Sequence, residues 1–221
     1  MRRPKKNKPI ILNEIKEAKK ILDFNVETTQ KLDEFQMLSI LSRYYYNVEH
    51  LSEFQVFLKL SEWIEKYIPE DEYNKKDWQK PLEYYSKNCN NAISNIDYIQ
   101  VSPKELKTIN TIPDKMSRII LFVLLCVAKY RNYLNNNNNN WTNITFQQLD
   151  VLTNYHISNE RYCKLLYELK EKGLINLAKK ITNTNIQVCF IDKEIDFNIP
   201  SLKIYSFEKL GIQYNNYTSN R

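Results

Sequence analysis

Glycine is nearly absent from this chain of 221 residues, which contains only Gly173 and Gly211. Loops that bind phosphate through backbone N–H groups need several glycines, because the backbone must adopt positive φ and approach the ligand closely. The sequence contains neither a Walker loop nor a dinucleotide-binding fingerprint. This scarcity argues against most classes of nucleotide-dependent enzyme.

Cysteine and histidine are few and scattered. The four cysteines form no C-x-x-C pair, and two of them, Cys126 and Cys189, lie within apolar runs. Such positions are typical of buried free thiols rather than of disulfides or zinc ligands. The two histidines, His50 and His156, are far apart along the chain. We therefore expect neither a metal site nor a cofactor.

Catalytic arrangements are not indicated either. Acidic clusters such as Glu70-Asp71-Glu72 lie on surface-like segments beside lysines, where a solvated charge cluster is expected. No grouping of Ser, His and Asp lies on the strand-to-helix elbow that would expose a nucleophile. The sequence predicts a protein that is not an enzyme.

Long hydrophobic runs are also missing. The strongest run, residues 119–128, is ten residues long, about half of what a bilayer-spanning helix needs. The basic N-terminus is not followed by the apolar segment of a secretory signal peptide. We therefore expect a cytoplasmic protein with no membrane partner and interpret residues 119–128 as part of a buried core helix.

Charge is distributed unevenly along the chain, whose formal net charge is +6. Residues 1–8 carry +5, residues 9–114 carry −5, residues 115–193 carry +6, and residues 194–221 are neutral overall. A basic arm and a basic C-terminal half therefore flank an acidic half. This asymmetry indicates that one part of the chain faces a polyanion.

The N-terminal half shows the apolar periodicity of helices. These helices are expected over residues 11–23, 30–46, 51–67 and about 77–93. Residues 97–101 alternate in polarity and indicate a short strand. The sequence Ser102-Pro103-Lys104-Glu105 then has the N-cap, proline and capping-box residues of a helix start. We predict a helical bundle here, with a domain boundary near residue 110.

The C-terminal half alternates helical and extended patterns. Helices are expected over residues 115–134, 146–153 and 158–172, a short strand or turn over 141–144, and strands over 174–181 and 186–191. Gly173 stands where a helix C-terminus favours glycine. The apolar flanks of the turn at Thr182-Asn183-Thr184-Asn185 predict a β-hairpin.

The order of helix, short strand, helix, turn, helix, glycine and hairpin resembles the winged-helix family over about residues 115–192. The segments 146–153 and 158–175 are similar to its helix-turn-helix and the start of its wing. The resemblance implies a C-terminal winged helix with a small β-hairpin. Together with the helical bundle that periodicity predicts for the N-terminal half, it gives a mainly α fold with a small β-hairpin. The expected parts are a basic arm (1–8), an acidic helical domain (9–110), a winged-helix domain (111–193) and a C-terminal extension (194–221).

In this family the second helix of the helix-turn-helix enters the DNA major groove. The resemblance assigns Asn159 and Arg161 to base edges and Lys164 to a phosphate. Lys179, Lys180 and the wing-tip Asn183 are expected to reach an adjacent groove or the backbone. The basic arm is expected to follow a minor groove or the phosphates. Its cationic residues are Arg2, Arg3, Lys5, Lys6 and Lys8.

The expected partner is therefore nucleic acid, with double-stranded DNA favoured and a protein partner or homodimer formed through the N-terminal half. Proteins laid out in this way include regulators and replication-initiation factors of phages, plasmids and AT-rich bacteria. The alternative is a small inhibitor or adaptor that binds a larger protein or ribonucleoprotein complex. Glu160, Glu168 and Glu171 favour this alternative, because they share the exposed side of the predicted recognition helix and would repel phosphates.

Overall fold

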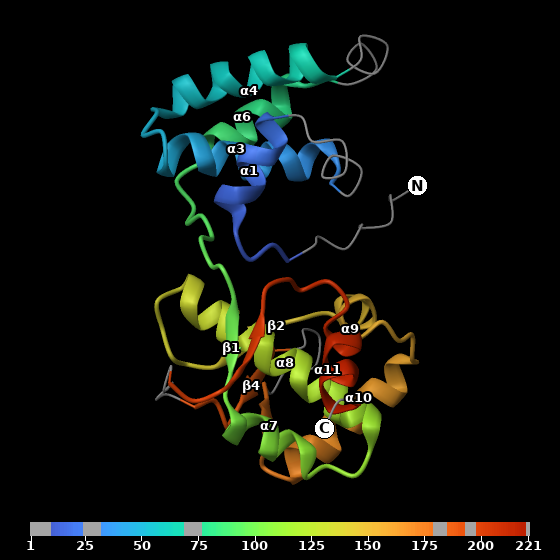
Figure 1. The fold of residues 1–221 in the computed structure, drawn as a ribbon. Helices are drawn as coiled ribbons and strands as arrows, with labels where there is room; N and C mark the ends of the chain where they lie inside the picture. The colour runs from blue at the N-terminus through green and yellow to red at the C-terminus, as the bar shows by residue number, and fades with distance from the viewer. Residues whose placement is uncertain (1–9, 24–31, 69–76, 179–184, 193–197, 220–221) are drawn as a thin grey trace. The chain divides into compact units, whose positions relative to one another are not determined.

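The computed structural model of the chain describes residues 10–23, 32–68, 77–178, 185–192 and 198–219. The described chain is mainly helical (Figure 1) and has small antiparallel sheets of two and three strands, which confirms the expected mainly α class. The backbone contacts divide the chain into a smaller unit, residues 13–96, and a larger unit formed by residues 1–12 and 97–221. The division after Ile96 precedes the boundary expected near residue 110, because β1 (Ile99–Val101) and α7 (Pro103–Asn110) pack on the larger unit.

The smaller unit consists, in its described part, of packed helices, and all but the last of them begin at a residue whose side chain caps the helix. These are α1 (Glu14–Leu22), α3 (Glu34–Asn47), α4 (Glu53–Tyr67) and α6 (Gln79–Lys87). Asp33 and Ser52 each form a reciprocal capping box with the glutamine three residues later, which satisfies two backbone donors at each helix start. Helix α6 ends at Lys87, before the expected residue 93. Buried apolar side chains between the helices, such as Leu38, Leu60 and Ile64, form the core.

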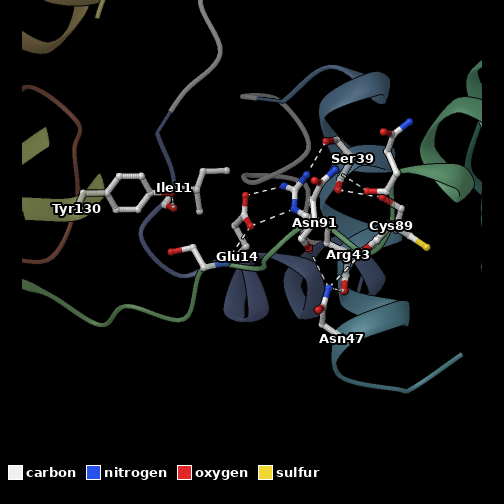
Figure 2. A network of polar contacts seen from close by, with 11 residues as sticks. Ile11, Glu14, Ser39, Arg43, Asn47, Cys89, Asn91 and Tyr130 are labelled. Carbon is white, nitrogen blue, oxygen red and sulfur yellow. Dashed lines mark hydrogen bonds and ion pairs between the residues drawn. The ribbon is translucent and has the colours of Figure 1, made fainter. Parts of the chain in front are cut away.

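A polar network ties α1 to α3 in this unit, as Figure 2 shows. The guanidinium of Arg43 binds both carboxylate oxygens of Glu14, at 2.6 and 3.3 Å. Arg43 also donates to the hydroxyl of Ser39. The amide of Asn47 donates to the carbonyls of Arg43, Cys89 and Asn91. A two-bond arginine–carboxylate pair restricts geometry as well as adding energy. This pair therefore fixes the start of α1 against the second half of α3.

The larger unit is built around α8 (Lys115–Leu134), whose residues 119–128 are all buried. Helices α7, α9 (Phe146–Thr153), α10 (Asn159–Glu171) and α11 (Leu210–Ser219) pack against it. The apolar run is therefore a core helix, as its length predicted. Among the described helices, none combines the length and apolar character that a bilayer crossing requires.

Two small sheets complete the larger unit. Strands β2 (Trp141–Asn143), β4 (Asn185–Val188) and β3 (Ile175–Leu177) form an antiparallel sheet in the order β2-β4-β3. Its register places Thr142 and Leu177 on either side of Ile186. The second sheet pairs β1 with β5 (Leu202–Ile204). The predicted hairpin is thus present as β3 and β4, and the segment at 141–144 contributes a third strand.

The asparagine run at 135–140 forms an ordered turn between α8 and β2. Asn136 and Asn140 have positive φ values of 47° and 61°, a conformation that asparagine tolerates better than most residues. Asn132 donates to the side chain of Asn140 and accepts from its backbone N–H. The run therefore connects the core helix to the sheet.

The C-terminal segment belongs to the core of the larger unit, although its sequence carried no clear signal for this. It supplies β5 and α11. Gly211 of α11 lies so close to α9 that a Cβ at this position would collide with the carbonyl of Thr153. Tyr214 packs its ring 4.9 Å from that of Phe122 on α8. Residues 198–219 thus cover the central helix rather than extending away from it.

Candidate nucleic-acid interface

The candidate interface centres on α10, which is amphipathic. Ser158 caps the helix by accepting a hydrogen bond from the backbone N–H of Arg161. One face of the helix is buried, as its spacing predicted, and consists of Tyr162, Leu165, Leu166 and Leu169. The opposite face is exposed, so its polar side chains are free to meet a partner.

The turn between α9 and α10 is held by Asp150. One carboxylate oxygen accepts a hydrogen bond from the hydroxyl of Tyr162, and the other lies 2.7 Å from Nδ1 of His156. The ring of Phe146 stacks on that of Tyr162, with centroids 5.1 Å apart. Asn154, with a φ of 60°, ends α9 in the left-handed conformation. These contacts fix α10 relative to α9, as a rigid recognition surface requires.

Burial and the hydrogen bond to Asp150 raise the pKa of Tyr162 well above its ordinary value. The phenol therefore remains protonated and keeps donating to the carboxylate. Sequence reasoning missed this role of Asp150. The sequence pattern could have indicated a special role, because Asp150 is the only acidic residue between positions 115 and 159.

The three predicted contact residues on α10 all lie at its surface. Asn159, Arg161 and Lys164 are exposed, within the first half of the helix. Arg161 also acts on Asp114, the N-cap of α8. Burial acts to raise the pKa of Asp114, but hydrogen bonds from Ser117 and the positive charges of Arg161 and Arg118 lower it overall. The charge of Arg161 therefore acts on the start of α8 as well as lying exposed at the start of α10.

Acidic and aromatic side chains share this surface. Glu160, Glu168 and Glu171 are exposed along α10. Tyr167 is 44% exposed, and the Nζ of Lys170 lies 5.9 Å from the centroid of its ring. The surface is therefore mixed in charge, with its described cations at Arg161, Lys164 and Lys170.

The remaining predicted contact residues lie outside the described part of the chain. They are Arg2, Arg3, Lys5, Lys6 and Lys8 of the arm, and Lys179, Lys180 and Asn183 between β3 and β4. The described hairpin strands β3 and β4 lead to and from residues 179–184. Across these strands, the amide of Asn176 donates to the side chain of Gln187.

The two compact units differ in charge. Residues 97–221 carry 16 basic and 11 acidic groups, a net of +5, and the arm adds another +5 to the same unit. Residues 13–96 carry 11 basic and 15 acidic groups, a net of −4. Because net positive charge attracts polyanions over distance, the larger unit is a better electrostatic match for a polyanion than the smaller unit.

The described residues contain no group of three or more His, Cys, Asp or Glu side chains that could hold a metal ion. Cys126 is fully buried, which raises the pKa of its thiol far above the ordinary value. Comparison with protein-family models, with curated proteins and with solved structures finds no match for this chain.

Proposed function

We propose that the larger unit is a winged-helix module that binds double-stranded DNA, with α10 entering the major groove. One observation carries the proposal: Asn159, Arg161 and Lys164 are exposed in the first half of a helix whose other face is locked in the core of the positively charged unit. Asparagine and arginine pair with adenine and guanine edges, and lysine binds phosphate as a point charge.

The order of elements supports the same proposal. Helix α8, strand β2, helices α9 and α10, and the hairpin of β3 and β4 follow one another along the chain. Strand β4 pairs with β3 on one side and with β2 on the other. Because β2 lies between α8 and α9 along the chain, this sheet joins the hairpin to the helices. In such an arrangement the hairpin tip, residues 179–184, contacts DNA beside the helix, and the arm at residues 1–8 contacts phosphates. The protein would then serve as a regulator or replication-initiation factor.

Binding of the full chain to a labelled DNA duplex across a salt series tests this function. Each phosphate contact contributes about 0.9 to the slope of log affinity against log salt. The double variant Arg161→Ala/Lys164→Ala should therefore bind more weakly and with a shallower slope. Lys104→Ala/Lys107→Ala removes the same charge from the exposed surface of α7 in the same unit and should change binding less. Absence of duplex binding, or equal effects of the two double variants, would contradict the proposal.

Deletion of residues 1–8 tests the arm separately. Contacts between the arm and phosphates carry no sequence information, so the deletion should weaken binding to all duplexes by a similar factor. A loss confined to one duplex sequence would instead assign base contacts to the arm.

A second candidate function is that of an adaptor that binds a protein. Phe54 and Leu58, one turn apart on α4, are 70% and 44% exposed, and the unit that contains them is acidic. Exposed apolar side chains of this size are suited to a protein interface. Co-purification of one stoichiometric partner that is lost with Phe54→Ser/Leu58→Ser, in a protein that binds no duplex, would favour this function.

A further inference from the structure

The two-stranded sheet of β1 and β5 carries a pair of facing tyrosines at one end. Ile99 pairs with Ile204 in this sheet, and both are buried. Tyr98 and Tyr205 continue the register by one position, and alternation along a strand turns them to the opposite face. Their ring centroids lie 5.8 Å apart, and Tyr205 is 66% exposed. Tyr98 is half-buried, so Tyr205 is the ring of the pair that is open to a partner.

A lysine completes this surface. Lys203 is exposed and lies two residues before Tyr205, so both side chains leave the strand on the same face. The Nζ of Lys203 is 4.7 Å from the centroid of the Tyr98 ring, within the range of a cation–π contact. We call Tyr98, Lys203 and Tyr205 the tyrosine platform.

We infer that the tyrosine platform binds single-stranded nucleic acid by stacking an unpaired base on Tyr205, with Lys203 meeting the adjoining phosphate. An exposed aromatic ring offers a face to any base, and a neighbouring cation follows the backbone. The platform lies on the unit whose net charge is positive, which suits a polyanion better than a basic or purely apolar partner. The inference rests on the proposed function only in taking nucleic acid as the partner of this unit.

The platform is separate in sequence from the proposed duplex-binding residues. It is formed by the ends of β1 and β5, whereas the duplex residues lie on α10. A protein with both surfaces can hold a duplex and a neighbouring unpaired strand, as occurs where a duplex has been opened. The two activities can therefore be removed one at a time.

The test measures fluorescence anisotropy of the full chain with labelled oligothymidine and, separately, with a labelled duplex. Stacking of one base on an aromatic side chain contributes about 1–3 kcal/mol, so Tyr205→Ala should weaken single-strand binding about 5- to 150-fold. Tyr205→Phe keeps the ring and should bind like the wild type. Lys203→Gln should reduce the salt dependence of single-strand binding.

Tyr133→Ala is the matched control, because Tyr133 is a tyrosine of the same unit that is 67% exposed at the end of α8. It should leave single-strand affinity unchanged. The inference is overturned if oligothymidine does not bind, or if Tyr205→Ala and Tyr133→Ala lower its affinity equally. Failure of duplex binding with an intact effect of Tyr205→Ala would instead overturn only the proposed duplex function.

Discussion

The Nζ of Lys129 lies 2.6 Å from the Oε2 of Glu105, and the two side chains are 8% and 0% exposed. Lys129 also donates to the carbonyl of Gln100, and Glu105 accepts from the backbone N–H groups of Ser102 and Asp192. One buried ion pair thus joins α8 to α7, to β1 and to the segment after β4. These hydrogen bonds offset the desolvation of both charges, which an isolated buried pair would not achieve.

Replacement of Lys129 by Met should lower the free energy of unfolding by about 3–5 kcal/mol, because Glu105 would be left charged and buried without its partner. Urea unfolding followed by circular dichroism measures the change. Lys107→Met on the exposed surface of α7 is the control and should change stability by about 0.5 kcal/mol or less. If Lys129→Met unfolds at the wild-type urea concentration, the ion pair is not structurally required.

The two glycines should respond differently to substitution. Gly211→Ala places a methyl group against the backbone carbonyl of Thr153 and 3.0 Å from a methyl of Ile119, an overpacking that costs about 1–3 kcal/mol. Gly173 has a φ of 69° with no neighbouring atom within 4 Å of an added Cβ, so Gly173→Ala costs only the left-handed conformation, about 1–2 kcal/mol. Asparagine should restore stability at 173 but not at 211. Thermal unfolding of the four variants would contradict this explanation if asparagine were tolerated equally at both positions.

Acid should weaken the start of α8. The pKa of Asp114 is lower in the folded protein than its ordinary value. The stability that its charged carboxylate contributes is therefore fully present above about pH 4, and it is lost as the pH falls through the lowered pKa. Asp114→Ala should cost about 1 kcal/mol at neutral pH through loss of the cap, and Asp114→Asn less. Both variants should show a flatter fall of stability below pH 4 than the wild type, measured by urea unfolding at each pH.

The pKa of Asp114 also depends on Arg161, a residue of the candidate interface. Arg161→Ala should raise the pKa of Asp114, because it removes a nearby positive charge. Carbon-detected NMR titration of the Asp114 carboxyl measures this directly. An unchanged midpoint would mean that Arg161 does not stand close to the start of α8 in solution.

Alkali should weaken the smaller unit through Tyr45. Burial, together with the negative charges of Glu49 and Glu62, raises the pKa of Tyr45 to about 12. Because the pKa of Tyr45 is raised in the folded protein, the stability that the protonated phenol contributes is fully present below the unfolded pKa, about 10. This stability is lost as the pH rises through 12. Tyr45→Phe should flatten the loss of stability between pH 10 and 12 in urea unfolding. An identical alkaline slope in the wild type and the variant would contradict this assignment.

Local signals account for the elements that were predicted well. The predicted cap at Ser102 marks a true helix start, because a capping side chain and its backbone donor are only three residues apart. The faces of α10 follow from the 3.6-residue period, which needs no distant residue. The segments after residue 193 were missed because β5 is three residues long and α11 has almost no apolar periodicity.

The sequence by itself determined the mainly α class, the helix start after Ser102, the inner and outer faces of α10, and the concentration of positive charge toward the C-terminal half. Each of these depends on residues within a few positions of one another or on simple composition. Only the tertiary structure decided that residues 97–110 and 198–219 join the larger unit, that Glu105 meets Lys129, and that Tyr98 meets Tyr205. These contacts join residues 24 to 107 positions apart, and such pairings are selected by the packing of the whole unit, which no local pattern records.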